Sequence, residues 1–163
     1  MPMKSSCTIL TILAVLLVGC TPSNRPAGLP PLHPCTITIT QNGSPLADVS
    51  VWLVATEPSE WPSTGVTDAS GQAMIVTFGQ FRGAPIGEYA VVLSKTVSEF
   101  NGTRGPDGEI VSGKTEFFSL VAVEYTKSET SVLKMTVVKG NNVQTFEIGE
   151  PVRILVDTIR PGE

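Results

Sequence analysis

The sequence has little charge and a single histidine, and both shortages argue against whole classes of function. Charged residues make up 16% of the 163 residues, the net charge is −4, and no run of lysine or arginine occurs. Nucleic-acid partners are therefore disfavoured, because they require a basic surface that neutralises phosphates. His33 alone offers neither a histidine-ligated zinc site nor a base close to a nucleophile. We expect no metal, no cofactor and no enzyme activity; a hydrolase that recruits His33 is the less favoured alternative.

The sequence also lacks an apolar run long enough to span a bilayer. Its longest apolar stretch, residues 7–18, has 12 uncharged residues, whereas a spanning helix needs about 20. Lys4 and the amino terminus place positive charge before this stretch. Positive charge followed by a short apolar core is typical of a secretion signal peptide.

A four-residue motif, Leu17-Val18-Gly19-Cys20, follows the apolar core and resembles the lipobox of bacterial lipoproteins. The resemblance implies that residues 1–19 are a signal peptide cut between Gly19 and Cys20, and that the Cys20 thiol carries diacylglycerol. Several acyl chains hold a protein stably on a membrane, whereas a single chain binds only reversibly. We therefore expect a membrane-anchored, extracytoplasmic lipoprotein. A plain signal peptide with an incidental Cys20 is the alternative.

The residue after the cysteine bears on which membrane is involved. In Gram-negative lipoproteins an aspartate at that place commonly signals retention in the inner membrane, and this sequence has Thr21. The resemblance therefore favours the outer membrane, on its periplasmic or surface face, if the host is Gram-negative.

Proline dominates the segment that follows. Residues 21–34 contain five prolines in 14 positions, and proline fixes φ and lacks the N–H that a helix or a sheet interior needs. We expect residues 20–34 to comprise the lipidated cysteine and an extended linker that holds a domain clear of the headgroups.

From Cys35 onward, short alternating stretches are separated by turns. Ile37 and Ile39 share one face of an alternating run, and Val49, Val51 and Leu53 share one face of the next. Further strands are expected over residues 65–67, 73–77, 87–93, 132–138, 143–148 and 152–156. We expect hairpins to join 65–67 to 73–77, around residues 68–71, and 132–138 to 143–148.

One long segment does not fit this pattern. Residues 96–115 are polar and glycine-rich without periodicity, so they are expected to form a long surface loop. The regular turn signals and the lack of a 3.6-residue period elsewhere predict one all-β domain over residues 35–163, a β-sandwich of about seven strands. Cys35, Phe117 and Phe118 are expected in its core, with an intermolecular disulfide through Cys35 as the alternative.

Three motifs in the first half of this domain resemble carboxypeptidase regulatory-like domains. Residues 43–51 are similar to the opening G-x-P-L-x-G-V-x-V, residues 65–73 to a T-D-x-x-G hairpin, and residues 83–91 to a G-x-Y-x-V strand. The resemblance implies a transthyretin-like (prealbumin-like) Greek-key β-sandwich, as in small lipoproteins of planctomycete-type bacteria. Asp48 stands where the family often has glycine. These motifs shape turns and strands and indicate no ligand.

Acidic residues and tryptophans are the remaining candidates for chemistry. Asp107 with Glu109, and Asp68 with Ser70, have oxygen ligands for calcium, but ordinary turn chemistry is favoured because neither forms a spaced acidic loop. Trp52, Trp61 and Phe81 are candidate ligand-binding residues, since exposed aromatic rings stack on sugars or fill pockets of a partner. Burial of these rings over the sandwich core is the alternative.

The expected function follows from the anchor, the linker and the lack of catalytic groups. We expect a non-enzymatic binding, adhesion or scaffold module of the cell envelope, held to a membrane by its lipid. Its partner would be an envelope protein or a glycan, and a carbohydrate-binding domain that uses the exposed aromatic residues is the alternative.

Overall fold

The computed structural model describes residues 25–159, which are all-β apart from one 3₁₀ turn, η1 (Val123–Tyr125). The expected signal peptide, its cleavage site at Gly19 and Cys20, and linker residues 20–24 lie outside the described residues. Within residues 25–159 there is no helix with the length and apolarity that a bilayer crossing requires.

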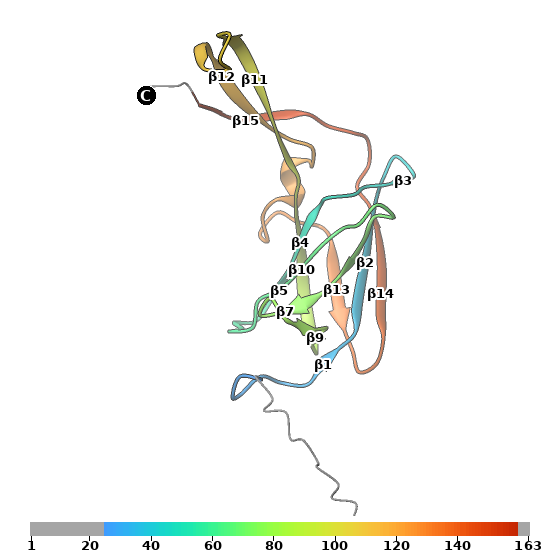
Figure 1. Cartoon of the computed structure of the whole chain (residues 1–163). Helices are drawn as coiled ribbons and strands as arrows, with labels where there is room; N and C mark the ends of the chain where they lie inside the picture. Colours follow the sequence, from blue (N-terminus) through green and yellow to red (C-terminus); the bar gives the residue numbers. More distant parts are fainter. Residues whose placement is uncertain (1–24, 160–163) are drawn as a thin grey trace, which may run out of the picture.

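Two sheets face each other across a common core (Figure 1). The larger sheet has the order β13 (Lys134–Val137), β10 (Gly87–Ser94), β4 (Ser50–Ala55), β5 (Ser63–Val66), β7 (Val76–Thr77) and β8 (Phe81–Arg82). The smaller sheet consists of β14 (Asn142–Glu147), β2 (Cys35–Gln41) and β3 (Ser44–Pro45), and β6 (Gln72–Met74) also pairs with β2. The body is therefore a β-sandwich in which β2 runs parallel to β14, near the other end of the chain.

Alternation along the strands fills the core. Ile37 and Ile39 of β2 and Val51 of β4 are fully buried, and Leu53 is 5% exposed. Trp52 lies between Val51 and Leu53 and is 38% exposed, because successive side chains of a strand point to opposite faces. The predicted inward faces of both strands are confirmed, and so is the burial of Cys35.

The turn at residues 68–71 forms as predicted, and the hairpin around it is confirmed in part. Asp68 Oδ1 accepts hydrogen bonds from the N–H groups of Ser70 (2.8 Å) and Gln72 (3.1 Å), and Gly71 has a φ of +74°. Thr67 and Ala73 bridge across the turn, and farther from it β5 pairs antiparallel with β7 (Ser63 with Thr77, Thr64 with Val76). Between these pairs β6 leaves the hairpin and pairs with β2 of the opposite sheet. The expected strand over residues 73–77 is therefore divided between the two sheets.

The second expected hairpin is wrong. β13 pairs with β10 and β14 pairs with β2, so the two strands belong to different sheets. Asn142, only 6% exposed, accepts a hydrogen bond from the Val138 N–H (2.9 Å) and donates to the carbonyls of Val138 and Gly140 (both 3.0 Å). This side chain closes the arch between the sheets, and a buried amide satisfied by the backbone fixes such a turn well.

The expectation of an extended proline-rich linker up to residue 34 is wrong, because the chain is already folded from residue 25. Residues 25–34, here called the strap, fold against one pole of the sandwich, where Leu29 is buried. Within the strap β1 (Leu32–His33) pairs with β9 (Ala84–Pro85). Prolines flank β1 instead of occupying it, so its backbone can pair at a sheet edge. The folded body therefore begins before Cys35.

A glycine allows the strap to lie this close. A Cβ at Gly83, whose φ is +98°, would be 2.4 Å from the carbonyl oxygen of His33. Further along the strap the Pro34 carbonyl accepts hydrogen bonds from the Asn142 N–H (2.9 Å) and side-chain amide (3.2 Å). The strap is thus held by backbone contacts on two sides of the pole.

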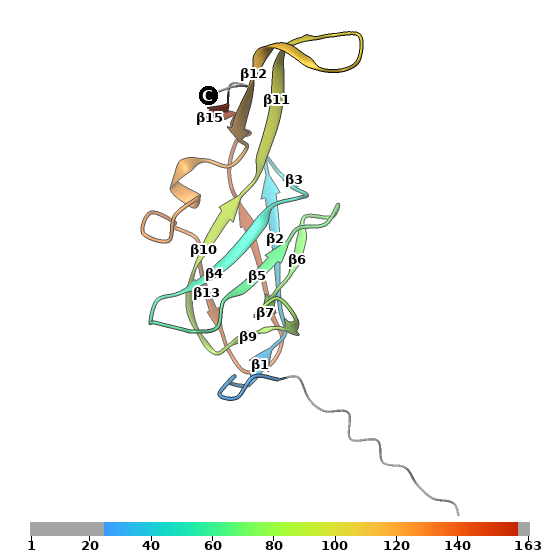
Figure 2. The same ribbon diagram turned by 60° about the vertical axis from the view of Figure 1, so that its left-hand side comes forward.

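Residues 96–115 are not a loop. β11 (Thr96–Arg104) and β12 (Ile110–Ser119) form a long hairpin, and β15 (Ile154–Ile159) adds a third strand to it. This three-stranded sheet, here called the arm, continues directly from β10 and projects from the pole opposite the strap (Figure 2). The last expected strand therefore exists, over residues 154–159, but it belongs to the arm.

The arm is held by aromatic residues that were not expected there. The Phe100 ring occupies the space above the paired Gly102 and Gly113, where its Cζ would lie 2.6 and 2.9 Å from a Cβ on either glycine. Aromatic rings over glycines compensate for their missing side chains in a sheet. The expectation that Phe117 and Phe118 lie in the sandwich core is wrong: both are half-buried on the arm.

Candidate functional site

The loop between β4 and β5, residues 56–62, positions the main candidate residue, Trp61. At one end of the loop the Thr56 N–H donates to the Glu88 carbonyl of β10 (3.0 Å), and at the other the Phe78 N–H donates to the Pro62 carbonyl (2.8 Å). Within it the Trp61 N–H donates to Ser59 Oγ (3.2 Å). The loop is therefore tied to both neighbouring elements rather than free at the edge of the sheet.

Trp61 packs edge-to-face against Phe78, with ring centroids 6.2 Å apart and an interplanar angle of 64°. Phe78 lies in the turn after β7, is 50% exposed, and has a φ of +54°. A bulky residue seldom adopts this left-handed conformation. The strained turn places the Phe78 ring against Trp61, and edge-to-face pairs are favourable for aromatic rings.

Two shallow hollows flank Trp61. One has a volume of about 440 Å³ and is lined by Trp61 together with strap residue Pro30, Ile86 and Tyr89. The other has a volume of about 330 Å³ and is lined by Trp61 together with Trp52, Val54 and Pro62. Each hollow therefore has aromatic and proline rings in its wall, and Trp61 is common to the two.

The polar groups of the hollows are acidic or neutral. Glu57 lines both hollows and Glu88 lines the larger one, and neither hollow is lined by lysine or arginine. Tyr89 Oη donates to the Pro85 carbonyl (2.8 Å), and burial, followed by the nearby Cys35 thiol, raises the pKa of the tyrosine. The site can offer ring faces and hydrogen-bond acceptors to a neutral or cationic ligand.

The structure brings two of the three predicted aromatic residues together. Trp52 and Trp61 line the same hollow. Phe81 pairs with Thr77 at the edge of the sheet and lines neither hollow, so the structure does not bring it together with the two tryptophans. The aromatic partner that sequence reasoning missed is Phe78, and its place directly before Gly79 is the one local signal for an aromatic ring in a turn.

The remaining candidates have structural roles. His33 Nδ1 accepts the Gly140 N–H (3.2 Å), which joins the strap to the β13–β14 turn. Cys35 is 2% exposed, and burial raises the pKa of its thiol to about 11. Among residues 25–159 no group of three or more histidine, cysteine or acidic side chains could hold a metal ion. Cys20 and Gly19 lie outside the described residues.

When the chain is compared with protein-family models, with curated proteins and with solved structures, none of the three comparisons finds a match. The resemblances to lipoproteins and to carboxypeptidase regulatory-like domains therefore rest on the motifs of this sequence.

Proposed function

We propose that this protein is a lipid-anchored, extracytoplasmic binding module of a bacterial cell envelope, without enzyme activity. The observation that carries the proposal is the order of positive charge, a 12-residue apolar core and Leu17-Val18-Gly19-Cys20. The shape of the described chain supports it, because the strap and the arm lie at opposite poles (Figure 1). A molecule held through its amino-terminal end would present the arm away from the membrane.

Replacement of the anchoring sulfur tests this function. Cys20→Ser should release the protein from the membrane fraction and prevent processing at position 20, because only a thiol forms the thioether. Thr21→Ser is a matched control that should leave both unchanged. Retention of the Cys20→Ser protein on membranes, with normal processing, would contradict the proposal. In a Gram-negative host we propose the outer membrane, since Thr21 is not the aspartate of the inner-membrane signal.

A second candidate function is carbohydrate binding at Trp61. It is favoured by the hollow that Trp52 and Trp61 share, with the Glu57 carboxylate as an acceptor for sugar hydroxyls. Sugar rings stack on aromatic faces, and tryptophan is enriched where binding energy is concentrated. Trp61→Ala and Trp52→Ala should each weaken retention on an envelope polysaccharide, whereas Phe81→Ala should not. Equal retention of all three variants would discard this candidate.

We also propose that the domain is a transthyretin-like Greek-key sandwich related to carboxypeptidase regulatory-like domains. Support comes from Asp48, the one departure from the opening motif, where the family often has glycine. Asp48 has a φ of +55°, a conformation that glycine adopts without strain and aspartate tolerates. The position thus has the backbone geometry that explains the glycine of the family.

A further inference from the structure

We propose that the strap pole of the sandwich docks on the surface of the phospholipid bilayer that carries the anchor, through an apolar rim formed by Trp61, Phe78, Ile86 and Val138. This inference rests on the proposed lipidation of Cys20 and goes beyond it. It assigns a protein face to the membrane in addition to the acyl chains.

Only a short length of chain lies between the anchor and the folded body. Had residues 20–34 been an extended linker, they could have held the domain about 45 Å from the headgroups. The strap takes residues 25–34 into the fold, so only the chain from Cys20 to Arg25 separates the two. Five residues reach at most about 18 Å, whatever their conformation. A lipid on Cys20 therefore keeps the start of the strap close to the bilayer.

The rim surrounds the place where the strap meets the body. Strap residue Pro30 lines the same hollow as Trp61 and Ile86. Trp61 contacts Phe78. Ile86 precedes Gly87, which pairs with Val137, so Val138 lies beside it. The four rim residues thus form a continuous border on the pole that a short tether must turn toward the membrane.

Three of the four rim side chains are exposed to solvent. Ile86, Val138 and Phe78 are 60%, 54% and 50% exposed. Tryptophan and other aromatic residues favour the bilayer interface, where an apolar ring meets the headgroups. Transfer of such side chains from water to the interface is favourable in proportion to the apolar area removed from water.

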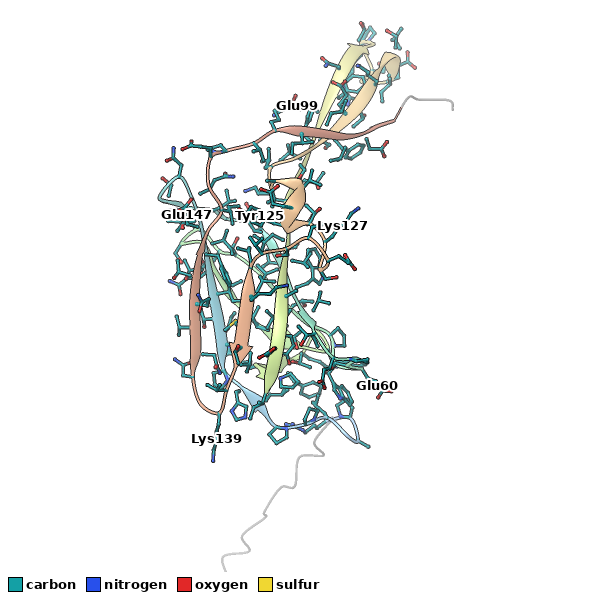
Figure 3. All side chains as sticks on the ribbon, turned by 180° about the vertical axis from the view of Figure 1, so that it is seen from behind. Glu60, Glu99, Tyr125, Lys127, Lys139 and Glu147 are labelled. Atoms are coloured by element: carbon teal, nitrogen blue, oxygen red, sulfur yellow. The ribbon has the colours of Figure 1, made fainter. Side chains whose placement is uncertain are left out.

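Charge around the pole indicates what kind of contact this is. Lys139 lies at the tip of the β13–β14 turn, while Glu60 lies on the flank of the molecule above it (Figure 3). Arg82 on β8 and Arg25 in the strap add positive charge, and Glu57 and Glu88 add negative charge at the hollows. Because the two signs are mixed, the contact should be apolar and depend little on salt.

A fluorescent probe on the rim tests the proposal in the lipidated protein. An Ile86→Cys variant, labelled with an environment-sensitive dye, is inserted into phosphatidylcholine vesicles that contain a lipid with a quencher near its headgroup. Cys35 is buried with a raised pKa and should not react with the dye in the folded protein. Ser112→Cys on the arm, also exposed, is the matched control.

We expect the dye at position 86 to lose fluorescence to the lipid quencher at low and at high salt, and the dye at position 112 to keep it. Adding Phe78→Ser and Val138→Ser should reduce the quenching at position 86 while the protein stays on the vesicles. An unquenched dye at position 86 on a protein whose Cys20 carries acyl chains would overturn the docking and leave the anchor intact. Quenching that the two serine substitutions do not change would also overturn it. An unmodified Cys20 would overturn both the anchor and the docking.

Discussion

Thr67 shows how one buried hydroxyl can fix the start of a strand. Its side chain is 2% exposed; Oγ1 accepts the Val49 N–H (2.8 Å) and donates to the Leu46 carbonyl (2.7 Å). These two backbone groups belong to the connection from β3 to β4, and Thr67 is their side-chain partner at the end of β5, the strand next to β4 in the same sheet. The threonine of the T-D-x-x-G motif therefore has a structural reason that its turn alone does not give.

Thr67→Val is expected to lower the free energy of unfolding by about 2 kcal/mol, because valine has the same shape but leaves a buried donor and acceptor unpaired. Urea denaturation followed by tryptophan fluorescence measures this. Thr38→Val on the outward face of β2 is the control and should change stability little. Equal effects of the two substitutions would show that the Thr67 hydroxyl does not hold the connection.

Asp48 tests whether a left-handed backbone is needed at the position before β4. Asp48→Val should lower the free energy of unfolding by about 1–2 kcal/mol, since a β-branched side chain at a φ of +55° is strained. Asp48→Gly should cause no loss, because glycine adopts this conformation freely. Thermal unfolding of the two variants checks the order. A glycine variant less stable than the valine variant would contradict it.

At the scale of elements, Glu147 connects the end of β14 to the turn between β2 and β3 (Figure 3). Its carboxylate accepts N–H groups from Asn42 (2.8 Å), Gly43 (3.1 Å) and Gly149 (3.1 Å). Hydrogen bonding with the Thr40 side chain, and then with these N–H groups, lowers the pKa of Glu147 below its ordinary value of 4.5. The ionised side chain thus joins the two parallel strands at the end facing the arm.

This arrangement predicts a pH dependence. Because the pKa of Glu147 is lower in the folded than in the unfolded state, its stabilisation is fully present above about pH 4.5 and is lost as the pH falls through the folded-state pKa. Glu147→Gln should therefore be less stable than the unchanged protein at pH 7, and the difference should shrink below pH 4.5. Urea denaturation at several pH values measures it, with Glu150→Gln as the control. A difference that stays constant with pH would refute this role.

The arm depends on a pair of facing glycines. A Cβ at Gly113, whose φ is +147°, would lie 2.6 Å from the Asn101 carbonyl oxygen and 2.9 Å from Phe100 Cζ. Gly113→Val should therefore separate β11 from β12 near this pair while the sandwich stays folded. Hydrogen exchange should show faster exchange in residues 96–119 and unchanged protection in β2 and β10. Ser112→Val, next to it on the same strand, is the control, and identical exchange in both variants would contradict the prediction.

At the scale of the whole molecule, alternation of apolar and polar residues was enough to predict the buried faces of β2 and β4. It could not predict which sheet a strand joins, since β6 pairs with β2 of the opposite sheet and the turn at Asn142 carries the chain across the sandwich instead of returning it to its neighbour. These sheet changes depend on contacts between residues distant in sequence. Local turn chemistry is the same whether the next strand pairs with its neighbour or joins the opposite sheet.

The arm and the strap were missed because neither buries one continuous face. Neither face of the arm is fully buried, so its strands carry no alternation, and its order comes from Phe100 over glycines and from Arg153 over the Phe118 ring at 4.0 Å. The strap contains prolines that argue against a sheet, but a two-residue pairing at an edge avoids them. For the site, exposure of Trp52 followed from the alternation, whereas its meeting with Trp61 required the fold of the loop.

The mass of the mature amino-terminal peptide, isolated with detergent from the native membrane, tests the central claim most directly. The account predicts a chain that begins at Cys20 and carries the added mass of a diacylglyceryl group on its sulfur. A chain that begins at any other residue, or an unmodified cysteine at position 20, would contradict it.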